Sequence, residues 1–193
     1  MSEQVDPATI PPSRVVLVSG ASRGLGLAMV TGLLEAGVSV AAFARTVTPE
    51  LDALAEQFPD TFHRGSVDIT DAAACQAFVK EVEAKLGIID GLVNNAAVGQ
   101  DSLHVHTSAD RIAQIIETNL TAPLVLTRYV LRRMMAKGRK GRIVNITSIC
   151  GQRGYQGLGG DSAAHGGGAR APPPPPPPVG GPPRGNTRAA RVL

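Results

Sequence analysis

Three glycines lie close together near the start of the chain. Gly20, Gly24 and Gly26 follow the apolar run Val15–Val18 and precede a segment with helical apolar spacing. Glycine permits a tight turn and a close backbone approach to a ligand, and the following helix presents free N–H groups to an anion. The G-x-x-x-G-x-G spacing predicts a loop for a dinucleotide pyrophosphate, with a purely structural turn as the alternative.

Two arginines indicate which dinucleotide this loop would take. An NAD site needs a carboxylate about 20 residues beyond the glycine loop to hold the ribose. Here the second apolar run ends at Ala44 and is followed by Arg45. A guanidinium suits a 2′-phosphate, and Arg23 in the loop is a second cation. We therefore predict NADP(H) rather than NAD(H), the alternative being that both arginines are solvated surface residues.

Elements that would position these residues alternate along the chain. Short β-branched runs predict strands at 14–19, 38–43, 62–67, 88–93 and 142–146. Apolar residues three or four apart predict helices at 25–36, 49–57, 71–86 and 108–137. Such alternation with apolar strands indicates an α/β fold of the Rossmann type, a doubly wound parallel sheet covered on both faces.

Composition changes abruptly after Leu158. Gly, Pro, Ala and Arg make up 27 of the 35 residues from 159 to 193. Such a segment buries too little apolar area to offset its ordering entropy, so we expect a sheet truncated after the fifth strand and a disordered C-terminal tail with a polyproline rod at 172–178. The expected parts are a flexible N-terminus at 1–12, a nucleotide-binding domain at 13–158 and this tail.

Further motifs follow the glycine loop in a fixed order. They are Asp68 after the third strand, Asn94-Asn95-Ala96-Ala97 after the fourth, Asn119 in a helix and Ser148 after the fifth. Together with the loop they resemble the classical short-chain dehydrogenase/reductase family, in particular the 3-oxoacyl-acyl-carrier-protein reductases. The resemblance covers about residues 13–158. It implies that the cofactor is held by Gly20, Ser22, Arg23, Gly24, Leu25, Gly26, Arg45, Asp68, Ile69, Asn95, Ala96 and Ala97.

The resemblance also implies a reaction. Family members pass hydride between nicotinamide and a carbonyl or alcohol, with Ser148 and Asn119 at the positions of the active-site serine and asparagine. A tyrosine about 13 residues after the serine donates the proton, and a lysine four residues later supports it. This sequence has Asp161 and His165 there. A carboxylate has no proton to donate at neutral pH, so we expect impaired catalysis.

The switch to Gly, Pro, Ala and Arg at this point is typical of out-of-frame reading of a GC-rich gene, because their codons begin with two G/C bases. Resequencing tests this hypothesis, and an intact single-frame gene ending in this tail would refute it. The tail carries four arginines and one acid, whereas residues 1–158 hold 15 basic and 15 acidic residues. The basic pI of the chain therefore comes from the tail and indicates no nucleic-acid-binding face on the folded part, and we expect no nucleic-acid partner.

Other expectations concern the cell and the partners. A polar N-terminus, two cysteines and the lack of a long apolar run predict a cytoplasmic protein without a membrane partner. We expect no metal site, and loss of the usual family homo-oligomer. The main interpretation is an NADP(H)-dependent oxidoreductase by ancestry that acts on a small carbonyl or alcohol substrate. The alternatives are a non-catalytic nucleotide-binding remnant and an interaction protein that works through its proline tail.

Overall fold

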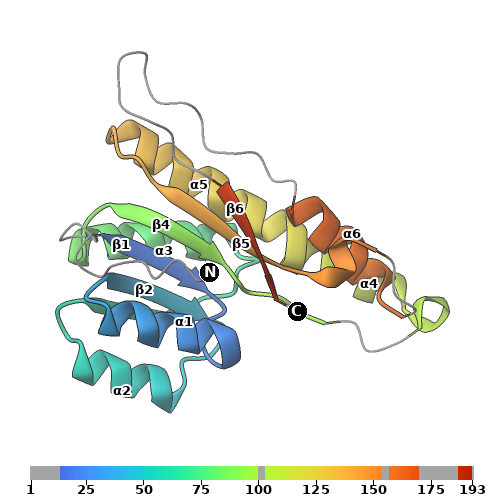
Figure 1. Cartoon of the computed structure of the whole chain (residues 1–193), viewed down its shortest axis with the longest axis horizontal. Helices are drawn as coiled ribbons and strands as arrows, with labels where there is room; N and C mark the ends of the chain where they lie inside the picture. The colour runs from blue at the N-terminus through green and yellow to red at the C-terminus, as the bar shows by residue number, and fades with distance from the viewer. Residues whose placement is uncertain (1–13, 100–102, 154–156, 170–186, 193) are drawn as a thin grey trace, which may run out of the picture.

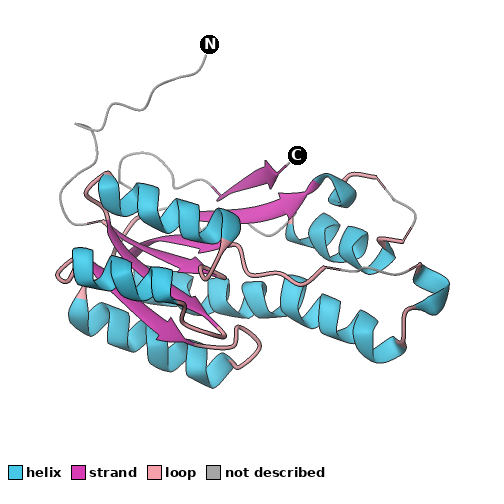
Figure 2. Ribbon diagram, turned by 90° about the horizontal axis from the view of Figure 1, so that it is seen from below, coloured by secondary structure: helices cyan, strands magenta, loops and turns pink. Residues whose placement is uncertain are grey.

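The computed structural model describes residues 14–99, 103–153, 157–169 and 187–192. It shows a twisted sheet with helices on both sides (Figure 1 and Figure 2). The strands lie in the order β3-β2-β1-β4-β5-β6, and all neighbouring pairs are parallel. The predicted doubly wound fold is confirmed.

In chain order the elements are β1 (Val15–Ser19), α1 (Gly24–Glu35), β2 (Ser39–Ala44), α2 (Pro49–Gln57), β3 (Phe62–Ser66), α3 (Ala72–Lys85), β4 (Ile89–Asn94), η2 (His104–His106), α4 (Ala109–Ile116), η3 (Glu117–Thr121), α5 (Ala122–Ala136), β5 (Arg142–Ser148), η4 (Ile149–Gly151), α6 (Gly159–Gly168) and β6 (Thr187–Val192).

Each face of the sheet has its own apolar core. On one face, α3 and α5 pack against the inner strands through residues such as Phe78 and Leu126, which meet Leu17 and Phe43. On the other face, α1 and α2 cover β1 and β2. Because the central strands are apolar on both sides, they can be buried between two helical layers, as expected for a parallel sheet.

The helix predicted from 108 to 137 is divided in the structure. Ser108 caps its start by accepting a hydrogen bond from the Arg111 backbone N–H at 3.2 Å. A single π-helical turn, η3, then separates α4 from α5 and contains the buried Asn119. Such turns occur frequently at functional sites because the extra residue redirects side chains. The periodicity of the sequence alone predicts an unbroken helix and does not reveal this turn.

The sheet contains the five predicted strands and one further strand, β6, at its edge. β6 pairs with β5 in parallel over six residue pairs, from Ile143↔Thr187 to Ser148↔Val192. The backbone of β5 has hydrogen-bonding groups along this edge, and an added strand satisfies them whatever its side chains. A prediction based on the small number of apolar side chains in the tail does not take this pairing of backbone groups into account.

Within the expected tail, the structure describes a helix, α6, which packs against η4, α4, η3 and β5. A Cβ placed on Gly151 would lie 2.8 Å from the carbonyl carbon of His165. Glycine at this position therefore lets the two backbones approach closely, and Ala164 of α6 is fully buried. Close packing of small residues can stabilise a contact even where little apolar area is buried. Residues 1–12 and the proline run 172–178 lie outside the described residues.

Candidate nucleotide site and reaction centre

Each of the three loop positions holds glycine for a different structural reason. Gly20 has a φ of 69°, and a Cβ there would lie 2.6 Å from the Cα of Ala96. Gly24 has a φ of 56° at the first residue of α1, and a Cβ there would meet nothing in the described structure within 4 Å. A Cβ on Gly26 would collide with the carbonyl oxygen of Gly20 and lie 2.6 Å from Asn95 Nδ2. The loop is therefore closely packed beneath and open above, at the start of a helix, as an anion site requires.

Two polar side chains attach this loop to the end of β4. Ser19 Oγ accepts hydrogen bonds from the backbone N–H groups of Asn95 and Ala96 at 3.1 and 3.2 Å. Asn95 Nδ2 donates to the carbonyl oxygens of Ser19 and Gly20 at 3.1 and 2.9 Å. The Asn95 side chain therefore holds the glycine loop. The importance of Ser19 was not predicted, although a polar residue ending a buried apolar strand was a signal for it.

A cleft of about 240 Å³ opens beyond the carboxyl ends of β2, β3 and β4. Among its lining residues are four of the predicted cofactor residues, namely Arg45, Asp68, Ile69 and Ala97. Ligands of open α/β sheets bind at this edge, next to the point where the strand order reverses. The cleft has the cation, the carboxylate and the apolar wall that an adenosine phosphate needs.

Asp68 is an exposed carboxylate that lines this cleft. Its Oδ1 accepts hydrogen bonds from the backbone N–H and the hydroxyl of Thr70 at 2.9 and 2.8 Å. These two bonds, with a smaller contribution from Arg45, lower the pKa of the Asp68 carboxyl against a weak opposing effect of burial. Asp68 is therefore an ionised acceptor throughout the neutral range.

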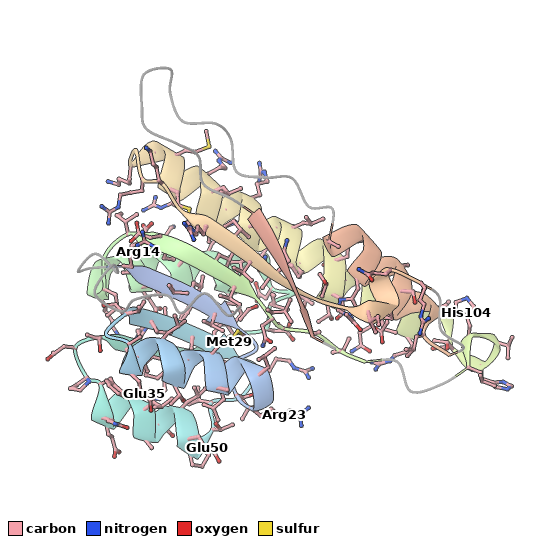
Figure 3. The ribbon with its side chains drawn as sticks, in the orientation of Figure 1. Arg14, Arg23, Met29, Glu35, Glu50 and His104 are labelled. Atoms are coloured by element: carbon pink, nitrogen blue, oxygen red, sulfur yellow. The ribbon has the colours of Figure 1, made fainter. Side chains whose placement is uncertain are left out.

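The remaining loop residues lie around the start of α1. Arg23 immediately precedes the helix, is exposed, and projects from its N-terminal end (Figure 3). The carbonyl oxygen of Ser22 accepts a hydrogen bond from Thr48 Oγ1 at 3.3 Å, which links the loop to the start of α2. Leu25 is 43% exposed. The structure thus places Ser22, Arg23 and Leu25 on the outer side of the loop and Arg45 in the cleft.

Asn119 is the centre of the second part of the site. Its Oδ1 accepts from the Val98 N–H at 2.9 Å, and its Nδ2 donates to the Val98 carbonyl oxygen at 2.8 Å. Nδ2 also lies 3.3 Å from Asp161 Oδ1, and both side chains are buried. The π-helical turn therefore directs Asn119 at once toward the segment after β4 and toward α6.

Asp161 and His165 lie four residues apart on α6. Residues at this spacing share one face of a helix. His165 lines a small cavity together with Asn119, Ala96 and Ala97. Ser148 lies half-buried at the end of β5, where its Oγ accepts a hydrogen bond from the Cys150 N–H at 3.3 Å. The structure thus brings Asn119, Asp161 and His165 together, with Ser148 on the adjoining strand.

The burial of His165 predicts a pH-dependent stability. Burial lowers the pKa of the imidazole below its ordinary value of 6.5, and the Asp161 carboxylate partly opposes this shift. The pKa of His63 is lowered as well, by burial and by Lys85 and despite Glu81. Both histidines take up protons more readily in the unfolded chain. Their contribution to the free energy of unfolding is therefore complete at pH values above the pKa of the unfolded chain. Stability should fall as the pH drops below 6.5.

Thermal melts at a series of pH values between about 7.5 and about 5.5 measure this effect, since the window brackets the ordinary histidine pKa. We expect Tm to fall with pH in the parent chain and to fall less steeply in the His165→Gln variant, with His63 responsible for the remaining slope. Equal slopes for the parent and His165→Gln would contradict the burial of this imidazole.

Histidines and helices outside this site form neither a metal centre nor a membrane span in the described ranges. Within the described ranges, no group of three metal-ligating side chains gathers in one place. His104 and His106 are exposed in η2. No helix of the described part is long and apolar enough to cross a membrane.

Comparisons with known proteins agree with this geometry. Residues 14–170 match the family model described as short chain dehydrogenase. The chain is 36% identical over 151 residues to 3-oxoacyl-[acyl-carrier-protein] reductase FabG of Vibrio harveyi, covering 78% of this chain and 61% of that protein. It is 39% identical over 152 residues to acetoacetyl-CoA reductase of Paracoccus denitrificans, with 79% and 62% covered.

A solved structure is also similar. It is the crystal structure of a short-chain dehydrogenase from Streptomyces avermitilis, with a TM-score of 0.77 and 33% identity, covering 83% of this chain and 58% of that one. The chain thus spans about three fifths of the length of these relatives. With the glycine loop, the strand order and the family match over residues 14–170 agreeing, the chain belongs to the short-chain dehydrogenase family.

Proposed function

We propose that the chain is an NADP(H)-binding oxidoreductase of the 3-oxoacyl reductase type whose hydride transfer is impaired. The observation that carries this proposal is the packing of α6 against the Asn119 turn. This packing supports the proposal that Asp161 and His165 occupy the positions for which the resemblance implies a proton-donating tyrosine and its supporting lysine. The relatives from Vibrio harveyi and Paracoccus denitrificans, which are named as reductases of 3-oxoacyl and acetoacetyl thioesters, support the reaction class.

The chain's own residues fit the cofactor. The open space above Gly24 and the start of α1 suit the pyrophosphate, and the cleft beside Arg45 and Asp68 suits the adenosine part. Ile69, Ala96 and Ala97 would contact the rest of the dinucleotide. When bound, NADPH supplies a hydride to a carbonyl carbon. The protein's task is to orient the two reactants and to supply a proton to the carbonyl oxygen.

Of the four active-site residues that the resemblance implies, the serine and the asparagine are present in this sequence. Ser148 would donate a hydrogen bond to the substrate carbonyl, and Asn119 would keep the segment after β4 in place through its two bonds to Val98. Asp161 and His165 replace the remaining two. Bound substrate would therefore lack a proton donor, so we expect binding of NADPH with little or no turnover.

The cofactor preference gives the sharpest test of the nucleotide site. Arg45 lines the cleft, and a charge-assisted bond to the 2′-phosphate contributes about 1.5–3 kcal/mol. Arg45→Asp should lower NADPH affinity by about tenfold to a hundredfold and raise NADH affinity, because a carboxylate accepts from the ribose hydroxyls. Calorimetric titrations of both dinucleotides measure this change.

A matched variant separates the specific effect of charge at Arg45 from a general loss of surface charge. Arg64 is ion-paired with Asp52 on β3 and α2 and is not among the cleft residues. Arg64→Asp should leave the ratio of NADPH to NADH affinity unchanged. An Arg45→Asp variant that keeps the parental ratio would contradict the proposed NADP(H) preference.

We further propose that the chain is located in the cytoplasm and that any substrate it binds is a small carbonyl or alcohol. It would have no nucleic-acid or membrane partner and would not form the usual family homo-oligomer. The equal numbers of acidic and basic residues before residue 159 support the absence of a nucleic-acid partner. Size-exclusion chromatography with light scattering tests the oligomer, and a dimer or tetramer would contradict this part of the proposal.

A further inference from the structure

A small cavity lined by both polar and apolar residues lies between β4, β5, α5 and α6. Its lining includes Asn94, Thr127, Asn145, His165 and Gly168. Its volume is about 20 Å³, whereas about 10–15 Å³ measured in this way is enough for one water molecule. Cavities of this size bind water when their walls carry polar groups and remain dry when they are apolar.

Asn94 supplies the group that points to a ligand. It is 5% exposed, and its Nδ2 donates hydrogen bonds to Thr127 Oγ1 at 2.9 Å and to Asn145 Oδ1 at 2.8 Å. Its Oδ1, by contrast, is buried and accepts no hydrogen bond from any described residue. Leaving a buried carbonyl oxygen without a donor is unfavourable. The site therefore requires a donor that the described part of the chain does not supply.

The neighbouring groups determine what kind of donor fits. Thr127 carries a hydroxyl that can turn its hydrogen toward the cavity while accepting from Asn94. Asn145 Nδ2 donates one of its two hydrogens to the Gly168 carbonyl oxygen at 3.3 Å, and the amide has a second hydrogen. A ligand here must donate to one oxygen and accept from a hydroxyl or an amide. Water can both donate and accept, and it fits the volume. A cation would be repelled by the N–H and O–H donors of the cavity.

We infer that this cavity is a binding site for one ordered water molecule, which donates to Asn94 Oδ1 and accepts from the Thr127 hydroxyl. The water connects the last residue of β4 to α5. Through the bonds from Asn94 to Asn145 and from Asn145 to Gly168, it belongs to a chain of hydrogen bonds that extends to the end of α6. It thereby joins the strand that precedes Asn95 and Ala96 to the helix that carries Asp161 and His165.

Nuclear magnetic resonance of the full chain, labelled with ¹⁵N, tests this site. We expect a cross peak between the Asn94 side-chain amide hydrogens and bound water. Thr127→Val keeps the shape of the side chain and removes the hydroxyl, so this variant should lose the cross peak. Thr31→Val is the matched control, because Thr31 lies in α1 and donates to the Leu27 carbonyl oxygen at 3.1 Å; it should keep the cross peak.

Two results would overturn the inference. One is a folded parent chain without the water cross peak at Asn94. The other is a Thr127→Val variant, folded by its amide spectrum, in which the cross peak is as strong as in the parent. If Thr127→Val does not fold, a high-resolution crystal structure of the parent decides, since the inference requires a water within hydrogen-bond distance of Asn94 Oδ1.

Discussion

Replacing Asp161 by tyrosine and His165 by lysine together should raise NADPH-dependent reduction of a β-keto ester by about a hundredfold, the lower end of what a positioned general acid contributes. The two positions lie on one face of α6, and Asp161 is next to Asn119. A phenol stays protonated at neutral pH, and a lysine ammonium one turn later favours its ionised form in the transition state. Initial rates of NADPH consumption measure the gain.

The control for this double variant removes a single hydroxyl group. Asp161→Phe with His165→Lys supplies the same ring and the same ammonium without the hydroxyl, so its rate should remain at the parental level. Each single substitution should also give little activity, because the two groups act as a unit. A double variant that folds and binds NADPH as the parent does, yet reacts no faster, would contradict the assignment of these two positions.

Gly26→Ala should destroy the nucleotide loop. The added methyl group would collide with the carbonyl oxygen of Gly20 and lie 2.6 Å from Asn95 Nδ2. The first is a backbone atom, and the second is held in place by its hydrogen bonds to the carbonyl oxygens of Ser19 and Gly20. We expect a loss of about 2–3 kcal/mol in the free energy of unfolding, as for overpacking in a rigid core. NADPH affinity should fall by about tenfold or more, because the loop must shift.

Gly32 in the same helix supplies the matched control. A Cβ at Gly32 meets nothing in the described structure within 4 Å, and alanine is favoured over glycine in a helix by about 0.5–1 kcal/mol. Gly32→Ala should therefore stabilise the chain and leave NADPH binding unchanged. Urea unfolding and NADPH titration of both variants measure the contrast. A Gly26→Ala variant as stable as the parent would contradict the close packing of Gly26 against Gly20 and Asn95.

The strands and the glycine loop could be predicted because their signals are local. β-branched runs such as Val15–Val18 and the spacing of Gly20, Gly24 and Gly26 are visible in a few residues. The capping of α3 by Asp71, which accepts from the Ala74 N–H at 2.9 Å, is of the same kind. These features depend on neighbours in sequence, so the sequence contains the information directly.

The parts that could not be predicted depend on distant contacts. The π-helical turn at Asn119 is stabilised by bonds to Val98 and Asp161, which are 21 and 42 residues away. α6 depends on the approach of Gly151 to the backbone of His165, and β6 depends on the edge of β5. Local composition predicted disorder there because the segment has too little apolar area to offset its ordering entropy. Backbone pairing and close packing also offset that entropy.

α6 also bears on the origin of the tail. The family match extends to residue 170, and Asp161 and His165 keep the four-residue spacing on one helix face. The two positions for which the resemblance implies tyrosine and lysine therefore lie within a helix that packs against the Asn119 turn. The hypothesis of out-of-frame reading stays a prediction, which resequencing of the gene decides.

The most direct test is a titration of the full chain with NADPH, followed by nicotinamide fluorescence, to which a β-keto ester is then added. We predict saturable binding of NADPH, tighter than that of NADH, and no consumption of NADPH after the ester is added. Absence of saturable binding would contradict the nucleotide site. NADPH consumption by the unmodified chain, faster than in the absence of protein, would contradict the claim that Asp161 and His165 impair the reaction.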